Sequence, residues 1–398
     1  FDKIKNFKKN IIFDGLYAAS IGYFDKLLDK YNIKYESLHM FHDPNFGGGM
    51  PEPKPKYLKD LIDKVKEISN SVGFANDGDS DRFGVINEDG EYVSPNEIIA
   101  ILLMHLKKNK KYSGPIVKTV GASLLLNKVA EKLEIEVIET AVGFKHVGEA
   151  MRKFNPIIGG EESGGMIMGS EELIESLSGR KAIAMREKSA TEAIIVASCL
   201  AAKLEEDNKT LSEYLMEIID ENNIVAKFDS REDIAYYNES EPDIDKLKSA
   251  KIEGEKMRTK NDLFYLSLAI AIKEGLASID EVKNVLNDSF EELDFNNLVS
   301  VKFVGDGTYL QFTDKYVEIR PSGTDAKTKA YSGGENLQEI EKYASIMGNY
   351  SGERTETHKK LISEDFYQNS KETALNYYLK FVEKDANNEV FQIPEYKY

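Results

Sequence analysis

The sequence contains a single cysteine, Cys199, among its 398 residues, so it can form no intramolecular disulfide bond. So little cysteine is typical of a reducing compartment, and we expect a cytoplasmic location. Long apolar runs are lacking too. The longest, near residues 193–202, falls well short of the roughly 20 residues that a membrane-spanning helix needs, so we expect no membrane partner.

Positive charge is also scarce in this chain. Lys and Arg number 52 against 69 Asp and Glu, and the formal net charge of −17 argues against a nucleic-acid partner, which would need a basic surface. A hydrophobic content of 41% is sufficient for buried cores. At roughly 100–200 residues per domain, a chain of this length predicts two to four domains.

Carboxylates are present in abundance, and three of them are regularly spaced. Asp77, Asp79 and Asp81 occupy alternate positions, followed directly by Arg82. Three neighbouring carboxylates repel one another unless a cation lies among them, and hard oxygen ligands suit Mg²⁺ or Ca²⁺. Short apolar strands are expected on both sides, so the sequence predicts a Mg²⁺ site on a strand-to-strand turn.

An EF-hand is the main alternative for this turn. The three aspartates would fall at positions one, three and five of the calcium loop, and Glu88 at position twelve. However, the position that requires glycine holds Arg82, and no amphipathic helix leads into the turn. A solvated acidic turn without a metal is the remaining alternative.

A second turn is rich in glycine. The apolar run 155–158 leads into residues 159–165, which read Gly-Gly-Glu-Glu-Ser-Gly-Gly. Glycines let a backbone approach a ligand closely, and Glu161 and Ser163 offer hydrogen-bonding groups that suit sugar hydroxyls. The turn is no nucleophile elbow, because Glu161 stands two residues before Ser163 where glycine is required. Its glycine spacing is also wrong for a dinucleotide fingerprint.

A third turn, residues 320–324, follows an apolar strand and reads Arg-Pro-Ser-Gly-Thr. A guanidinium, two hydroxyls and a glycine that frees backbone N–H groups together suit a phosphate. The predicted phosphate ligands are Arg320, Ser322, Gly323 and Thr324. An ordinary hairpin with a surface arginine is the alternative for this turn taken alone.

The chain's pattern of elements changes near residue 226. Before it, strands alternate with amphipathic helices, which implies parallel sheets covered by helices. After it come charged helical segments that we interpret as a linker, then strands. Helices are expected at residues 57–68, 95–107, 124–133, 244–251, 262–274 and 279–286, and strands at 115–120, 135–138, 301–304, 308–312, 316–319 and 327–331. The segment beyond Gly352 is expected to be a surface extension.

These patterns predict an α/β protein. Two α/β/α domains with mainly parallel mixed sheets are expected, plus a smaller C-terminal α+β domain. The predicted boundaries are 1–112 for the metal-loop domain, 113–225 for the sugar-loop domain, and 226–398 for the helical linker, the phosphate-binding domain and the extension.

The three turns, in this order, resemble the motifs of the α-D-phosphohexomutase superfamily, the phosphoglucomutases and phosphomannomutases. Residues 142–145, Val-Gly-Phe-Lys, are similar to a substrate-facing loop of that family, and residues 43–46 and 50–53 to a stretch ahead of its metal loop. The resemblance covers about residues 10–334.

Three departures from the family are visible. The family's first domain carries a serine loop, typically Thr-Ala-Ser-His-Asn-Pro, and no Ser-His-Asn occurs in this sequence. We therefore expect family domains two to four, with the phosphoserine domain missing. A Lys-Asp-Gly element is replaced within residues 186–191, and Asp325-Ala326 stand where Glu-Pro is common.

The resemblance implies an isomerase that transfers a phosphoryl group between C1 and C6 of a hexose phosphate, through a hexose bisphosphate and an enzyme phosphoserine. Glucose is expected as the sugar ahead of mannose. The implied roles are metal binding for the three aspartates, catalysis for Arg82 and Lys145, sugar binding for Glu161 and Ser163, and phosphate binding for residues 320–324. The alternatives are a catalytically inactive, mutase-like sugar-phosphate binding protein and a Ca²⁺-binding protein.

Overall fold

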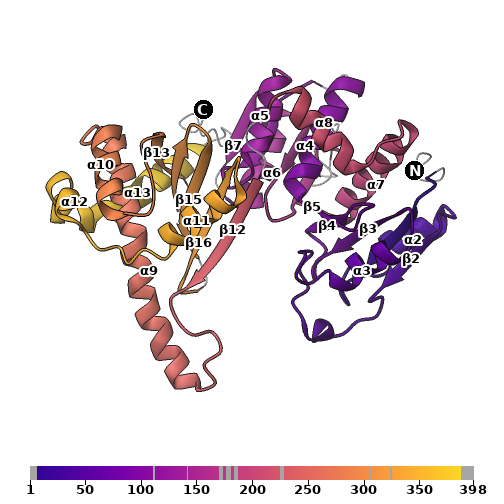
Figure 1. The fold of residues 1–398 in the computed structure, drawn as a ribbon, viewed down its shortest axis with the longest axis horizontal. Coiled ribbons are helices and arrows are strands. Elements are labelled where there is room, and N and C mark those ends of the chain that lie inside the picture. Colours follow the sequence, from indigo (N-terminus) through magenta and orange to yellow (C-terminus); the bar gives the residue numbers. More distant parts are fainter. Residues whose placement is uncertain are drawn as a thin grey trace. The chain divides into compact units, whose positions relative to one another are not determined.

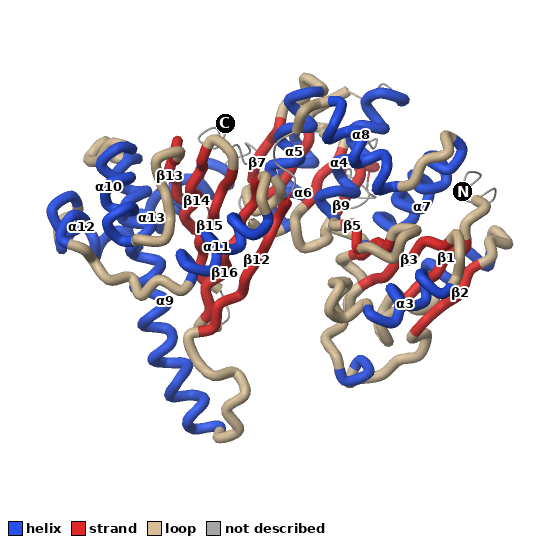
Figure 2. The backbone as a smooth tube through the Cα atoms, in the orientation of Figure 1, coloured by secondary structure: helices blue, strands red, loops and turns tan. Residues whose placement is uncertain are grey.

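The computed structural model describes residues 7–110, 113–140, 142–169, 174–175, 181–182, 187–224, 228–304, 307–322 and 325–386. The chain divides into two compact units, with the boundary after Ile224, and each unit is described by itself (Figures 1 and 2). Among the described residues, no helix combines the length and apolar character required to cross a membrane.

The first sheet of unit 1 has five strands in the order β2-β1-β3-β4-β5. Strands β2, β1 and β3 are parallel, while β4 and β5 return antiparallel, so the sheet is mixed. Its elements are β1 (Asn10–Asp14), α2 (Phe24–Lys30), β2 (Tyr35–Leu38), the short helix η1 (Phe46–Gly48), α3 (Lys59–Glu67), β3 (Ser71–Asn76), β4 (Phe83–Ile86) and β5 (Tyr92–Val93). Helix α3 packs on one face and α2 on the other, giving the predicted α/β/α layers.

The second sheet of unit 1 has four strands in the order β7-β6-β8-β9, of which only β9 runs antiparallel to its neighbour. Helix α6 covers one face, and α4 and α5 cover the other. The elements are α4 (Pro95–His105), η2 (Leu106–Lys110), β6 (Ile116–Thr119), α5 (Leu124–Lys132), β7 (Val137–Thr140), α6 (Phe144–Phe154), β8 (Ile158–Gly160), β9 (Met166–Met168), β10 (Ile174–Glu175), β11 (Lys181–Ala182), α7 (Ala190–Glu206) and α8 (Leu211–Glu221).

Local sequence signals explain where these helices begin. Ser94 caps α4, because its side chain accepts the N–H of Glu97 while the Glu97 carboxylate accepts the N–H of Ser94. Pro95 follows at the first helical position, where a missing N–H costs nothing. The predicted helices at residues 57–68, 95–107 and 124–133 are confirmed to within two residues at each end.

Unit 2 is built on an antiparallel sheet in the order β12-β16-β15-β14-β13. Its elements are β12 (Phe228–Ala235), α9 (Ile244–Lys273), α10 (Ile279–Ser289), β13 (Leu298–Val304), β14 (Gly307–Phe312), β15 (Lys315–Pro321), β16 (Lys327–Gly334), α11 (Leu337–Gly348), α12 (Glu356–Leu361) and α13 (Glu364–Ala386). Apolar residues of α9 and α11 join one face of the sheet in a single core. The mixed α/β class predicted for the chain is confirmed.

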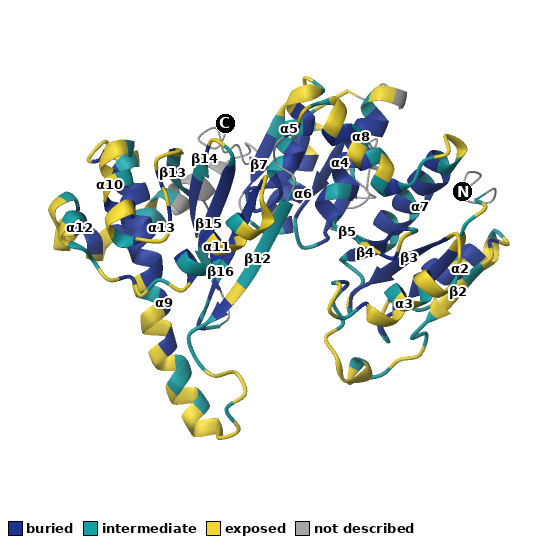
Figure 3. Cartoon of the chain, in the orientation of Figure 1, coloured by how far each residue is buried: buried dark blue, intermediate teal, exposed yellow. Residues whose placement is uncertain are grey.

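Two predictions about this unit were wrong. The segments 244–251 and 262–274 form one continuous helix, α9, and not two helices in a linker. The residues between them are mostly good helix formers, and Gly254 lets the helix lie against Tyr236, whose carbonyl oxygen would be 3.0 Å from an added Cβ. The first half of α9 is largely exposed, whereas its second half is buried (Figure 3).

The segment beyond Gly352 is also not a mere surface extension. Its residues His358, Ile362 and Tyr367 are buried in the core of unit 2. The acidic, tyrosine-rich composition of the segment did not predict these contacts. They are made by a few side chains that reach α9 only in the folded chain. The three-domain division and its boundaries stay a prediction.

His358 generates a test of this core. Its side chain is fully buried, its Nδ1 accepts Arg354 Nε at 2.8 Å, and its ring stacks on Phe264. Burial, with the positive charge of Arg354, lowers the pKa of His358 from 6.5 to about 4. Between these pH values the unfolded chain binds a proton that the folded chain does not, so unfolding becomes easier as the pH falls from 6.5 to 4.

We predict that His358→Gln flattens this part of the pH dependence of the unfolding free energy, whose slope from one such group approaches ~1.4 kcal/mol per pH unit. Urea unfolding at a series of pH values measures the slope. His42→Gln, at an exposed histidine, is the control and should leave it unchanged. Equal slopes in the native and His358→Gln proteins would contradict the assignment.

Candidate functional site

The predicted metal loop lies at the carboxyl end of a parallel strand. Strand β3 runs parallel to β1 and ends at Asn76, and the chain returns antiparallel in β4. The turn is therefore flanked by strands, as predicted, and not by the helices of an EF-hand. Glu88, which would be the last EF-hand ligand, instead forms an ion pair with Lys9.

Asp77 organises this loop from within. Its side chain is fully buried, and its Oδ1 accepts the backbone N–H groups of Asp81 and Arg82, each at 2.9 Å. Its Oδ2 accepts Arg82 Nε at 2.6 Å. Burial raises the pKa of Asp77 to about 6, although the hydrogen bonds and charge of Arg82 act in the opposite direction.

The three aspartates converge at one point. Each offers one carboxylate oxygen, and these three oxygens lie within 4.8 Å of one another. Oxygens on opposite sides of a Mg²⁺ ion lie about 4.2 Å apart, so small shifts would suffice for a shared ion. Ser80 Oγ and Asp81 Oδ1 are buried and have no hydrogen-bond partner among the described residues. The donor set therefore fits a divalent cation with further oxygen ligands.

Residues 50–53, which precede the metal loop in the sequence, contact it directly. Gly78 donates its N–H to the Pro51 carbonyl at 3.0 Å, and an added Cβ at Gly78 would lie 3.0 Å from the Pro51 ring. Arg82 Nη1 lies 3.6 Å from Glu52 Oε1. The segment 50–53 thus holds both the backbone and the arginine of the loop in place.

The two predicted sugar ligands contact each other. Glu161 follows β8 directly and is 4% exposed, and its Oε1 accepts Ser163 Oγ at 2.6 Å. Oε1 also accepts Lys188 Nζ at 2.8 Å. The Glu161 carboxylate thus fixes the position of the Ser163 hydroxyl, whose oxygen can still accept a hydrogen bond from a ligand.

The sugar loop packs directly on the metal loop. Phe83 donates its N–H to the Gly164 carbonyl at 3.2 Å. Gly164 has φ +105°, and Gly165 lies so close to Lys188 that an added Cβ would be 2.6 Å from Lys188 Cδ. Glycine is required at both positions, at the first by the backbone angle and at the second by the close approach.

Lys188 joins the two loops and was missed as a site residue. Its Nζ lies 2.8 Å from Glu161 Oε1 and 3.4 Å from Asp81 Oδ2. Partial burial would lower the pKa of Lys188, but the two carboxylates, chiefly Glu161, raise it above its usual value. A sequence signal was present, since Lys188 is the retained lysine of the altered Lys-Asp-Gly element.

The altered residues of that element begin helix α7. Ser189 caps the helix by accepting the N–H of Glu192 at 3.3 Å, and Ala190 donates its N–H to the Ser80 carbonyl at 3.1 Å. Helix α7 therefore still begins against the metal loop, although Ser189 and Ala190 stand in place of the acid and the glycine.

Lys145 lies beside this cluster and is exposed. It stands in the first turn of α6, next to Phe144, whose ring centroid is 5.9 Å from Lys188 Nζ. The backbone before α6 turns at Gly143, which has φ +122°. The predicted role of Lys145 stays a prediction.

The predicted phosphate loop belongs to unit 2. Arg320 lies near the end of β15 opposite Lys329 of β16, which places two cations on neighbouring strands. Ser322 is buried and donates its N–H to the Lys327 carbonyl at 2.8 Å. The predicted ligands Gly323 and Thr324 lie outside the described residues.

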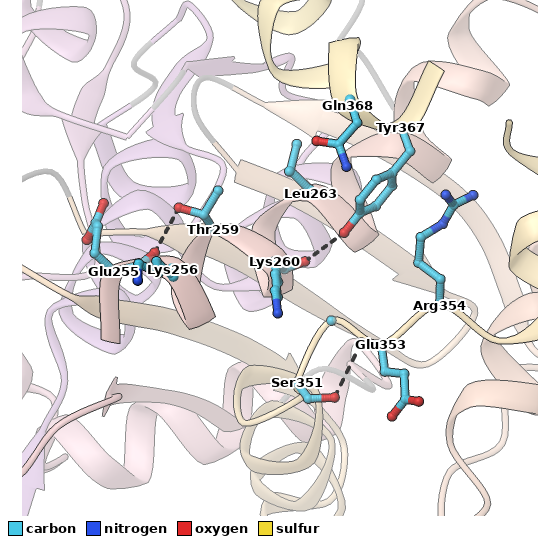
Figure 4. A pocket seen from close by; sticks show the side chains of 11 residues that line it. Glu255, Lys256, Thr259, Lys260, Leu263, Ser351, Glu353, Arg354, Tyr367 and Gln368 are labelled. Carbon is cyan, nitrogen blue, oxygen red and sulfur yellow. Dashed lines mark hydrogen bonds between the residues drawn. The ribbon is translucent and has the colours of Figure 1, made fainter. Parts of the chain in front are cut away.

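Unit 2 also contains an open pocket of about 680 Å³ (Figure 4). It lies between α9, the loop 351–354 and the start of α13, and none of the predicted site residues lines it. Arg354 at its edge is engaged with His358, Glu364 and the Ile362 carbonyl. Lysines and glutamates are mixed on its wall, and this arrangement assigns no ligand.

Two family models match the chain. The phosphoglucomutase/phosphomannomutase α/β/α domain II matches residues 1–90, and domain III of the same family matches residues 94–221. The two matches fall on the α/β/α layers whose strand ends carry the carboxylate loop and the glycine-rich loop, so the chain is of the phosphoglucomutase/phosphomannomutase class. The chain belongs to the α-D-phosphohexomutase superfamily, as its motifs indicated.

Curated relatives cover parts of the chain. The phosphoglucosamine mutase of Methanocaldococcus jannaschii is 32% identical over 40% of this chain and 36% of its own length. That of Wolinella succinogenes is 40% identical over 27% of this chain and 24% of its own length. The matched segments thus span well under half of these relatives.

Solved structures show the same fold over most of the chain. Parafusin of Paramecium, a phosphoglucomutase in its open form, superimposes with a TM-score of 0.60 at 18% identity, over 90% of this chain and 60% of its own. A phosphoglucomutase/phosphomannomutase family protein of Burkholderia thailandensis gives 0.55 at 15% identity, over 87% of this chain and 64% of its own.

The geometry of the metal loop predicts the effect of one substitution. Asp79 is exposed, so Asp79→Asn should leave the fold intact while removing a charged ligand. We expect Mg²⁺ binding, measured by calorimetry, to weaken at least about tenfold. Asp89→Asn, an exposed aspartate in the next turn, is the matched control. Unchanged Mg²⁺ affinity in Asp79→Asn would show that the ion lies elsewhere.

Proposed function

We propose that this chain forms the metal-binding, sugar-binding and phosphate-binding parts of a hexose-phosphate mutase. The contact that carries the proposal is Lys188, which bridges Asp81 of the metal loop and Glu161 of the sugar loop. The ammonium group of Lys188 contacts both the proposed cation site and the proposed sugar site, so the two are separated by a single side chain. Phosphoryl transfer to a sugar hydroxyl requires that proximity.

The proposed cofactor is Mg²⁺, held by Asp77, Asp79 and Asp81. When bound, it would neutralise charge on the phosphoryl group being transferred. Arg82 holds Asp77 in place through Oδ2 and presents the rest of its guanidinium beside the same loop. In this role it would stabilise the equatorial phosphoryl oxygens, since phosphoryl transfer depends mainly on alignment and charge neutralisation.

The sugar and its second phosphate are assigned to the remaining residues. Glu161 and Ser163 would hydrogen-bond sugar hydroxyls, and the ammonium of Lys188 would hold the Glu161 carboxylate in position. Lys145, exposed at the start of α6, is proposed as the acid–base group or phosphate contact. Arg320, Ser322, Gly323 and Thr324 would hold the phosphate that is not reacting.

For the substrate, we propose a gluco-configured hexose phosphate ahead of a mannose phosphate. The sequence indicated glucose through the Glu-Glu-Ser-Gly loop, whereas the curated relatives named above are phosphoglucosamine mutases. Glucose and glucosamine differ only at C2, where an ammonium would be attracted by Glu161 or Glu162. A binding comparison of glucose 6-phosphate, glucosamine 6-phosphate and mannose 6-phosphate separates the three.

The proposed partners are a hexose phosphate, a hexose bisphosphate and a phosphoserine domain. Ser163 is hydrogen-bonded to Glu161, and a phosphoserine dianion there would be repelled by that carboxylate. Ser80 is enclosed between two aspartates of the metal loop. Neither residue suits a phosphoryl carrier, so we propose that a serine loop outside this sequence supplies the phosphoryl group.

The phosphate assignment is tested at Arg320. Arg320→Lys keeps the charge but loses the planar fork that binds two phosphate oxygens, so glucose 6-phosphate should bind more weakly while glucose is unaffected. Calorimetry with both ligands measures the difference. If both ligands lost affinity equally, Arg320 would not be a phosphate anchor.

Because the proposed phosphoryl carrier lies outside this sequence, we predict that the purified 398-residue chain, with Mg²⁺ and glucose 1-phosphate, forms no glucose 6-phosphate. Adding the separately produced phosphoserine domain of a relative should restore turnover, and Asp79→Asn should abolish the restored activity. Turnover by the chain alone, free of contaminating mutase, would reveal a nucleophile within it. Sugar-phosphate binding without any restored turnover would favour the inactive binding protein.

A further inference from the structure

Helix α9 places a buried cation directly against the phosphate loop. Arg258 lies midway along α9 and is 8% exposed. Its Nη1 donates to the Ser322 carbonyl at 2.9 Å, and its Nη2 pairs with Glu255. Arginine is rarely buried unless its charge and donors are used, so this contact calls for a physical reason.

The other flank of the loop is held from the same side. Asp325 accepts the hydroxyl of Tyr237 at 2.6 Å, and Lys251 Nζ lies 3.3 Å from its Oδ1. Lys327 Nζ is 3.7 Å from its Oδ2. Tyr237 precedes α9 and Lys251 lies on it, so the β12–α9 segment contacts both Ser322 and Asp325.

These contacts remove two obstacles to binding an anion. A carboxylate at Asp325 would repel a phosphate, and the two lysines neutralise it. A carbonyl oxygen turned towards a phosphate would repel it as well. The hydrogen bond from Arg258 holds the Ser322 oxygen on the α9 side, which fixes the loop's backbone before any ligand arrives.

One donor of Arg258 has no use in the structure. Its Nε–H is buried and has no hydrogen-bond partner among the described residues. A buried N–H group of a charged side chain that makes no hydrogen bond lowers the stability of the fold. A purely structural role therefore does not explain why this arginine is buried. A nearby dianion would benefit from the same charge.

We infer that Arg258 is a positioning residue of the phosphate site: it fixes the Ser322 backbone and supplies buried positive charge next to Ser322. The inference rests on the proposed function of that loop as a phosphate site. The expected ligand is the phosphate dianion of a hexose phosphate, and inorganic phosphate is the simplest probe.

The test compares variants of the full chain by calorimetry with inorganic phosphate and with glucose 6-phosphate. Arg258→Met should weaken both ligands by at least about tenfold, and Arg258→Lys, which keeps the charge, should lie between it and the native protein. Mg²⁺ affinity, which reports on unit 1, should be unchanged in both variants, and their urea unfolding should show that unit 2 is still folded. Lys248→Met removes a charge from an exposed site of the same helix, 72% exposed, and should have less than about a twofold effect.

Chemical rescue and a second variant keep the inference falsifiable if Arg258→Met folds poorly. Guanidinium ions added to Arg258→Ala should restore phosphate affinity. Tyr237→Phe, which removes only the hydroxyl that holds Asp325, should weaken phosphate by several-fold. If Arg320→Lys weakened phosphate but the Arg258 variants bound it normally, the inference would fail and the proposed function would stand. If none of these variants altered phosphate binding, the phosphate assignment of the loop would fail as well.

Discussion

The structure of unit 1 depends on how it neutralises carboxylates that are forced together. Asp77 is fully buried at the end of β3, and Asp81 and Glu161 lie close by on two different loops. Arg82 and Lys188 offset this charge from opposite sides. The two cations cannot satisfy all the oxygens, and Asp81 Oδ1 remains without a hydrogen-bond partner among the described residues. This incomplete neutralisation fits the proposed binding of a divalent ion.

Unit 2 meets a related constraint with the opposite sign. If the loop 320–324 binds a phosphate, as proposed, local cations must outweigh the overall field of a chain with a net charge of −17. Arg320 and Lys329 lie on neighbouring strands, and Arg258 comes from a helix. A site built from strand ends and a helix reorganises little when a ligand binds. This favours a reaction whose rate depends on the alignment of the reacting groups.

Predictions from local chemistry agreed with the structure where a short segment decides its own conformation. Ser94 and Pro95 begin α4 as their side chains require, and the strands flanking residues 77–82 pair as the apolar pattern indicated. The prediction was wrong where packing decides. The buried His358 depends on a contact with Ser267 of α9, 91 residues away in the sequence, which composition does not reveal. The continuity of α9 depends partly on the close approach of Gly254 to Tyr236.

The sequence by itself determined three motifs: alternate aspartates, a glycine-flanked glutamate and an arginine turn, each encoded in a few consecutive residues. It also determined the family, because three such motifs occur in order. Only the tertiary structure decided which cations serve these motifs. Lys188 and Arg258 act across 27 and 64 residues of sequence, respectively. Their partners could not be read from local pattern, because a long charged side chain finds its counterpart only after the strands and helices that carry both have packed.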